Sequence, residues 1–254
     1  MGLFSNLNTD GLEAKEDRVG GGGFTRESGV YAMTIKVAYA GASQGGAQFV
    51  DFTFVDDNEK EYRETFYVTG RNGQNWFEAK DKNGKTTGKK RALPGFDHVN
   101  DICLVTCDKT LSEMADEQKT VNVYDHEAGR QIPKSVPCLT ELHGKKVYLA
   151  IQKRLENKNA KDSSGEYVAT AETREVNTVE KVGHFPTKTT VVEAQESLEP
   201  AYLDTWAKNN DGKTLDKRTI KDGDSNGGTS GRPGGAPPTG NTGGAAPERK
   251  KLFG

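Results

Sequence analysis

Residues 30–69 run VYAMTIKVAYAGASQGGAQFVDFTFVDDNEKEYRETFYVT, and this stretch decides the fold that the sequence predicts. Apolar and polar residues alternate within three runs, which are residues 30–39, 48–55 and 60–69. A period of two indicates strands with one buried face. The breaks between the runs are rich in glycine or in Asp and Asn, which favour turns. Three strands joined by short turns predict an antiparallel meander.

Alternation assigns the side chains of these strands to two faces. The inward face takes the apolar set, which is Tyr31, Met33, Ile35, Val37, Tyr39, Val50, Phe52, Phe54, Tyr62, Phe66 and Val68. The outward face takes Lys36, Phe49, Thr53, Arg63, Tyr67 and Arg71. Aromatic rings interleaved with cations on a sheet face are typical of surfaces that hold nucleic-acid strands. The alternative is that a second layer, such as the helix expected over residues 189–208, covers this face.

Weaker patterns later in the chain predict helices and further strands. A short helix is expected over residues 97–107, with Val99, Ile102 and Val105 buried. Further strands are expected over residues 120–124, 145–153 and 166–182, and a helix over 189–208 that Pro200 can split. In the strand at 145–153, Val147, Leu149 and Ile151 face the core, whereas Tyr148 faces outward, as Arg154 does just beyond its end.

The order of these elements is three meandering strands, a helix and then more strands. It fits a mainly β, OB-fold-like, five-stranded, partly open barrel with a short helix between strands 3 and 4. An additional helix near the C-terminus and a disordered tail complete the prediction. A jelly roll or another β-sandwich has a similar order and is the alternative.

Charge predicts a local basic patch and not a generally basic surface. The formal net charge is −2, so a nucleic-acid site must be confined to one region. The cations between residues 71 and 91 are Arg71, Lys80, Lys82, Lys85, Lys89, Lys90 and Arg91, with Trp76 and Phe77 among them. Cations for phosphates and rings for bases predict single-strand binding by this turn-rich segment. The alternative is that the two rings plug one end of the barrel.

Composition divides the chain into three parts. Residues 1–29 are expected to form an N-terminal arm with a Gly-rich hinge, and residues 30–208 the nucleic-acid-binding domain with its C-terminal helix. Residues 209–254 are dominated by Gly, Pro, Ser, Thr and Asn, and such a tail is expected to be disordered. Its apolar tip, Leu252-Phe253, predicts a docking peptide for partner proteins.

Signatures of an enzyme are weak in this sequence. Walker-type phosphate loops and the GxSxG and HExxH patterns are absent, so we expect no enzymatic activity and no cofactor. A nuclease would need clustered carboxylates to hold a divalent metal. Asp51, Asp56, Asp57 and Glu59 are close in sequence, but most of them stand where a turn favours polar residues.

The cysteines and histidines predict structural roles. His98, Cys103 and Cys107 share a predicted helix, but a zinc site usually has two ligand pairs, so buried thiols are expected and no metal. The third cysteine is Cys138, and a sparse, odd set indicates a reducing cytoplasm. No signal peptide and no apolar run of about 20 residues is visible, so no membrane segment is expected.

Several blocks of the sequence resemble the single-stranded DNA-binding proteins of tailed bacteriophages. These blocks are LFSNLNTDGLEAKEDR with the following GGGGF, LPGFDHVNDICLVT, GKKVYLAIQKRLENKN, AETREVNTVEKV, and the Gly/Pro-rich tail that closes on KKLFG. The resemblance implies an OB-type core and a role in phage DNA replication, recombination and repair, in the cytoplasm of the infected host. It implies protection of transient single strands and recruitment of polymerase-, helicase- or primase-class proteins through the tail. A homo-oligomer is compatible with it.

One feature departs from that resemblance. Many replication single-strand binders end in an acidic tail with a terminal Phe, and that tail competes with DNA for the binding site. Here Leu252-Phe253 follows Arg249-Lys250-Lys251. A basic tip cannot mimic DNA electrostatically, so we expect a partner hook and no self-inhibition.

The sequence thus predicts a non-enzymatic binder of single-stranded DNA without strong sequence preference. Phosphate contacts are assigned to Arg63, Arg71, Lys80, Lys82, Lys85, Lys89, Lys90 and Arg91, base stacking to Tyr67, Trp76, Phe77 and Tyr148, and Lys36 and Arg154 complete the DNA-binding set. The alternative function is that of a phage structural or decoration protein with a β-sandwich body.

Overall fold

The computed structural model describes residues 25–125, 128–220 and 252–253. Its strands are β1 (Gly29–Ala42), β2 (Gln48–Val55), β3 (Glu61–Tyr67), β4 (Trp76–Lys80), β5 (Thr86–Ala92), β6 (Glu117–Asp125), β7 (Arg130–Cys138), β8 (Lys146–Lys161), β9 (Tyr167–His184) and β10 (Thr214–Asp216). Its helices are α1 (Pro94–Cys107), α2 (Val191–Glu196) and α3 (Tyr202–Asn210), and two short 3₁₀ turns span Leu111–Glu113 and Thr140–Leu142. The predicted mainly β class is confirmed.

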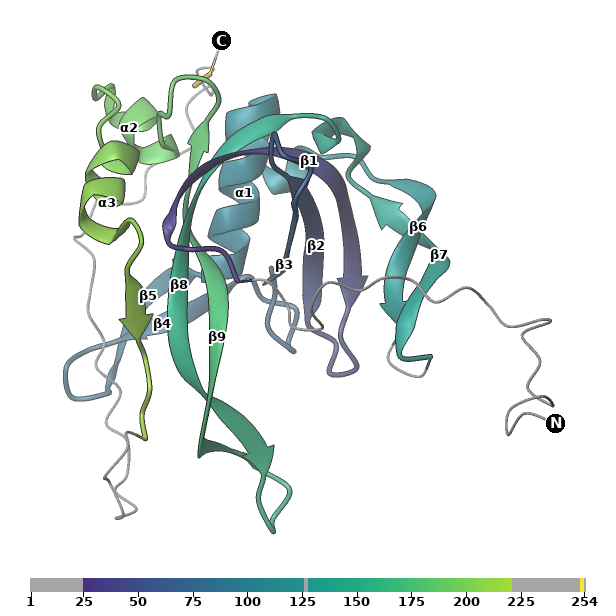
Figure 1. Ribbon diagram of the computed structural model, residues 1–254, viewed down its shortest axis with the longest axis vertical. Coiled ribbons are helices and arrows are strands. Elements are labelled where there is room, and N and C mark those ends of the chain that lie inside the picture. The colour runs from purple at the N-terminus through teal and green to yellow at the C-terminus, as the bar shows by residue number, and fades with distance from the viewer. Residues whose placement is uncertain (1–24, 126–127, 221–251, 254) are drawn as a thin grey trace, which may run out of the picture.

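Strand β1 is central to the main sheet because three strands, β2, β7 and β8, pair with it. Its first part, Gly29–Thr34, pairs antiparallel with β8, and its second part, from Thr34 to Ala42, pairs antiparallel with β2. Strand β3 continues the meander beyond β2, while β9 and the short parallel strand β10 pair with β8. The predicted antiparallel meander is therefore confirmed, and the sheet curves around α1 (Figure 1).

A β-bulge in β1 corrects the predicted faces of this strand. The pairing with β2 shifts between Ile35 and Val37, so Lys36 is an extra residue on β1. Met33 and Ile35 point into the core as predicted, but after the bulge Ala38 takes the buried position. Val37 and Tyr39, predicted inward, therefore lie on the outer face. A bulge adds one residue to one strand and so reverses the alternation beyond it.

The core lies between the curved sheet and α1. Phe52 and Phe54 of β2 are fully buried with their rings 5.2 Å apart, and Phe66 of β3 packs edge-on to Phe52. Other members confirm the predicted inward faces, namely Val50, Tyr62, Val68, Val99, Ile102, Val105, Val147, Leu149 and Ile151. Helix α1 begins at Pro94, before the predicted residue 97, because proline suits the first helical turn.

The sheet is not closed. Among the described residues β3 pairs only with β2, and β9 only with β8. Helix α1 packs against both β3 and β9, and a cavity of about 500 Å³ lies where the three elements meet. A Cβ on Gly95 would lie 2.3 Å from the carbonyl oxygen of Tyr67, so glycine is required for this close approach of α1 to β3.

Several predicted details change. The described residues form ten strands: besides β1, β2, β3, β8 and β9, β4–β5 forms a separate hairpin, β6–β7 forms an arm beside the sheet, and β10 pairs with β8. The helix expected over 189–208 is divided into α2 and α3, with Pro200 between them, as proline allows. No helix in the described parts of the chain is long and apolar enough to cross a membrane.

The body extends beyond the predicted boundary at residue 208. Strand β10 pairs with β8, and the backbone N–H groups of Thr219 and Ile220 donate to Asn157 Oδ1 at 2.7 and 3.0 Å. The predicted hinge and most of the predicted arm and tail lie outside the described residues.

Glu64 places a carboxyl group in the opening between β3 and β9. Its neighbour Tyr62 donates a hydrogen bond to it, and it lines the cavity under α1. Burial raises the pKa of Glu64 to about 7, although Tyr62 and Arg154 oppose the rise. The folded chain therefore holds a proton that the unfolded chain releases above its ordinary pKa of 4.5. Stability contributed by this group falls as the pH rises from about 4.5 to about 7.

We expect Glu64→Gln to stabilise the protein at about pH 8 by about 2–3 kcal/mol and to have little effect at about pH 4. Gln retains an acceptor for Tyr62 but carries no charge to desolvate. Urea unfolding across this pH range measures the difference. Glu61→Gln is the matched control, since Glu61 is on the same strand but its pKa is lowered by Lys36 and Arg63. A stability gain that is the same at every pH would contradict the assignment.

Candidate nucleic-acid interface

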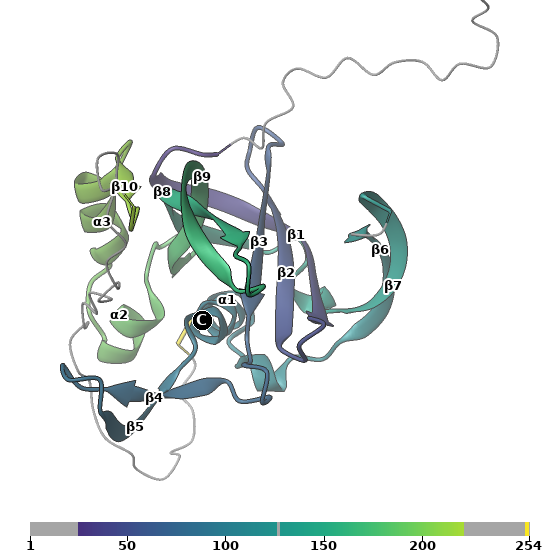
Figure 2. The same cartoon turned by 90° about the horizontal axis from the view of Figure 1, so that it is seen from below.

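A groove runs between the outer face of β1–β2–β3 and the β6–β7 arm. The arm pairs with β1 only at its base, through Tyr39 and Cys138, and Figure 2 shows it curving alongside the sheet. Two cavities of about 610 and 860 Å³ lie along it, and they share Tyr39, Asp51 and Tyr124 in their linings. We call this continuous space the sheet–arm groove.

Four aromatic side chains line the sheet–arm groove: Tyr39, Phe49, Tyr67 and Tyr124. Tyr67 is 50% exposed and Tyr124 is 52% exposed, so both offer ring surface to a ligand. Phe49 meets Tyr67 edge-on at 5.8 Å. It also lies over Gly41, where a Cβ would approach its ring to 2.5 Å.

Three of the predicted cations also line the sheet–arm groove: Lys36, Arg63 and Arg71. Lys36 and Arg63 both pair with Glu61, at 2.7 and 3.1 Å. Arg63 also reaches across the groove to the side-chain amide of Gln131 on β7. Arg71 is exposed at the end of the groove beside Gly45.

Two carboxylates line the groove: Glu61, which pairs with Lys36 and Arg63, and Asp51, which lies in its floor. The Thr65 hydroxyl donates to Asp51 at 2.7 Å. Burial raises the pKa of Asp51. Burial, together with the neighbouring Asp51, also raises the pKa of Tyr39 to about 12. Tyr39 therefore stays neutral at physiological pH and presents an uncharged ring at the centre of the groove.

The basic segment predicted at 71–91 forms a hairpin on the other side of the molecule. Figures 1 and 2 place β4–β5 on the side of α1 away from the β6–β7 arm, and the Asn83-Gly84 turn closes it as the sequence suggested. Trp76 lies under the Lys90 ammonium group at 3.9 Å, and Phe77 is 44% exposed. The hairpin also carries exposed Lys80, Lys82, Lys85, Lys89 and Arg91. The predicted set is thus divided between the groove and this basic hairpin.

Two predicted residues lie at neither place. The ring of Tyr148 is 5.4 Å from that of Phe185 and lies near Lys188, so the chain that follows β9 covers it. Arg154 pairs with Glu180 of β9. Helix α3, the alternative cover for the outer face, packs against β1 and β8 and does not line the groove.

Sequence reasoning missed two aromatic residues of the groove. The alternation places Tyr39 in the core, because a bulge leaves no clear signal in an alternating pattern. Tyr124 ends a predicted strand, but the sequence pattern predicts no partner strand at β7. Pro133 and Pro137 weaken the strand pattern of β7, and the hairpin with β6 would have been the signal.

Two acidic residues of the nuclease alternative are held in ion pairs. Asp56 pairs with Arg26 at 2.7 Å and Asp57 with Lys146 at 3.2 Å. Cys103 is fully buried, as expected, whereas Cys107, also expected to be buried, is only half-buried at the end of α1. Cys138 is fully buried as well. Across the described residues, no group of three or more His, Cys, Asp or Glu side chains is arranged to hold a metal ion.

The tip of the tail lies on the body. Leu252 and Phe253 pack against the core beside the C-terminal end of α1, and they line neither cavity of the sheet–arm groove. Comparison of the chain with protein-family models and with curated proteins gives no match.

Proposed function

We propose that this protein binds single-stranded DNA in the sheet–arm groove, without strong sequence preference. The observation that carries the proposal is the presence of four aromatic rings and three cations in one continuous groove. Aromatic rings stack on any base, at about 1–3 kcal/mol per base, and cations follow the phosphates. The chemistry of the groove is therefore suited to strands of varied sequence.

The topology supports an OB-type core. In that fold the face of strands 2 and 3 binds oligonucleotides, and here the same face of β2 and β3 forms the groove floor. Strands β1, β2, β3, β8 and β9 would be the five core strands, with α1 after the meander and its following hairpin. In this proposal β4–β5 and β6–β7 are insertions, and the opening between β3 and β9 makes the barrel partly open.

The basic hairpin β4–β5 is proposed as a second contact with the same strand. Its lysines and Arg91 would bind phosphates that leave the groove past Arg71, and Phe77 offers a partly exposed ring. The resemblance to phage single-strand binders extends this proposal to replication, recombination and repair in an infected host, with partner proteins recruited by the tail.

Binding is tested with fluorescent oligo(dT) and anisotropy at two salt concentrations, against double-stranded competitor. For single strands the affinity falls with a slope of about 0.7 per phosphate contact. If each of the three groove cations contacts one phosphate, the affinity should fall about 20-fold between about 50 and 200 mM salt. The affinity should fall more steeply if the hairpin also binds DNA. Absence of binding, together with co-purification with phage particles, would favour the structural-protein alternative.

The part played by the hairpin has a separate measurement. The chain has two tryptophans, Trp76 and Trp206, so a Trp206→Phe variant leaves Trp76 as the reporter. Quenching of this variant by oligo(dT) would place DNA on the hairpin, whereas binding without quenching would confine DNA to the groove.

A further inference from the structure

The C-terminal tip of the chain makes specific contacts with the body. The backbone N–H of Leu252 donates to Asp108 Oδ1 at 3.1 Å. The ring of Phe253 stacks on that of His184, with centroids 4.9 Å apart and an angle of 27° between the planes. Both side chains are partly buried against the core.

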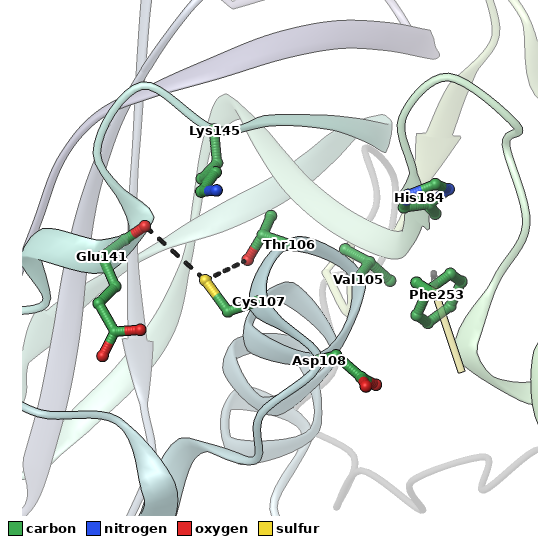
Figure 3. Close-up of a pocket in the computed structure, with 8 residues that line it drawn as sticks. All are labelled: Val105, Thr106, Cys107, Asp108, Glu141, Lys145, His184 and Phe253. Atoms are coloured by element: carbon green, nitrogen blue, oxygen red, sulfur yellow. Dashed lines mark hydrogen bonds between the residues drawn. The ribbon is translucent and has the colours of Figure 1, made fainter. Parts of the chain in front are cut away.

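Phe253 forms part of the wall of a cavity of about 470 Å³, and we call this cavity together with the seat of the tip beside it the tip pocket. Its walls come from the end of α1, the turn before β8 and the end of β9, and Figure 3 shows Phe253 facing His184 beside Val105. Asp108 ends α1 in a left-handed conformation with φ of 53°. His184 is hydrogen-bonded through Nδ1 to Thr187 at 2.9 Å, so both contact groups are held in place.

The tip pocket offers contacts for an apolar peptide end. Asp108 and Glu141 line it, but the Glu141 carboxylate is paired with Lys109 at 2.5 Å and Lys145 also lines the pocket, so its charges nearly balance. Recognition of the tip therefore rests on the ring contact of Phe253 with His184 and on the hydrogen bond from Leu252 to Asp108. The tip pocket shares no lining residue with the sheet–arm groove.

We propose that the tip pocket is a peptide-binding site whose occupant is Leu252-Phe253 of the same molecule. Thirty-one residues, 221–251, join Ile220 to the tip, and a chain of that length can span up to about 100 Å. Because the tip and the pocket belong to one molecule, the tip competes with peptides of other proteins as an intramolecular ligand. The docked tip is withheld from other proteins, which must displace it, while the groove stays open to DNA.

The test uses full-length protein and a fluorescent peptide of residues 248–254, with sequence ERKKLFG. We expect the peptide to bind a Phe253→Ala protein at least about tenfold more tightly than the wild type, whose own tip already occupies the contacts with His184 and Asp108. In the Phe253→Ala background, His184→Ala should weaken the peptide by about three- to tenfold through loss of the ring stack. Asp108→Gly removes the acceptor for Leu252 and tolerates the left-handed φ, so it provides a second variant with the same expected direction.

Two results would overturn the proposal. One is equal peptide affinity for the wild type and Phe253→Ala, or equal affinity with and without His184. The other is an NMR shift of His184 in the wild type that grows with protein concentration, which would assign the pocket to the tip of a second copy. Tyr167→Ala is the control, because Tyr167 is exposed at the far end of the β8–β9 hairpin. No DNA is present, so the outcome is independent of the proposed DNA binding.

Discussion

Replacing Tyr67 and Tyr124 together with alanine should lower the affinity for oligo(dT) by about 30-fold or more. Each stacked ring contributes about 1–3 kcal/mol, and each 1.4 kcal/mol changes the affinity about tenfold. These two rings are the most exposed of the four in the sheet–arm groove, and they come from β3 and β6. A DNA strand that lies in the groove can therefore stack on both rings.

The measurement is a fluorescence-anisotropy titration of each single variant and of the double variant. Tyr167→Ala is the matched control. Tyr167 is 69% exposed, lines neither cavity of the groove, and lies under the ammonium group of Lys161. Urea unfolding of each variant checks that the fold is retained, since neither groove tyrosine is buried. Unchanged affinity in the double variant, with DNA still bound, would move the site away from the sheet–arm groove.

The strands were largely predictable because one face of each is buried. The alternation of Val50, Phe52 and Phe54 identifies the buried face of β2 from the sequence. Tyr62 and Phe66 identify the buried face of β3 in the same way. The outward positions of Arg63 and Tyr67 follow from the same rule, and the structure confirms both as exposed. Local periodicity thus predicts the side of the groove that β2 and β3 form.

The rest of the candidate site depends on contacts between distant segments. The bulge at Lys36 changes the direction of Tyr39, and it is seen only in the register of β1 with β2. Tyr124 reaches the groove only because β7 joins β1 through Tyr39 and Cys138. Conversely, Tyr148 is outward in β8 as predicted, but the segment after β9 covers it. Single-sequence periodicity carries no information on any of these pairings.

Arg26 joins two parts of the body that the sheet leaves unpaired. Its guanidinium donates to Asp56 Oδ2 at 2.7 Å and to the Lys60 carbonyl at 2.8 Å, in the turn between β2 and β3. Its backbone N–H donates to Asn177 of β9, and Asn177 donates back to the Arg26 carbonyl. The side chains of the ion pair are only 6% and 12% exposed. The contacts of Arg26 therefore connect the turn between β2 and β3 to β9, across the opening between β3 and β9.

Asp56→Ala should therefore destabilise the folded protein by about 3–5 kcal/mol, because it leaves the Arg26 guanidinium buried without its counter-charge. The buried Arg26 Nε has no hydrogen-bond partner among the described residues even in the wild type. No described neighbouring acceptor is therefore free to replace the Asp56 carboxylate. Urea unfolding at neutral pH measures the loss. Asp57→Ala is the matched control: Asp57 is the next residue in the same turn, its side chain is 75% exposed, and its pair with Lys146 should contribute less than about 1 kcal/mol.

A double variant distinguishes the orphaned charge from simple loss of a contact. Adding Arg26→Met to Asp56→Ala should recover much of the lost stability, because an apolar side chain of similar length removes the uncompensated charge. If the double variant is instead less stable than Asp56→Ala alone, the hydrogen bond from Arg26 to the Lys60 carbonyl is the dominant interaction. In either case a loss for Asp56→Ala no larger than that for Asp57→Ala would show that the bridge between β3 and β9 does not stabilise the open sheet.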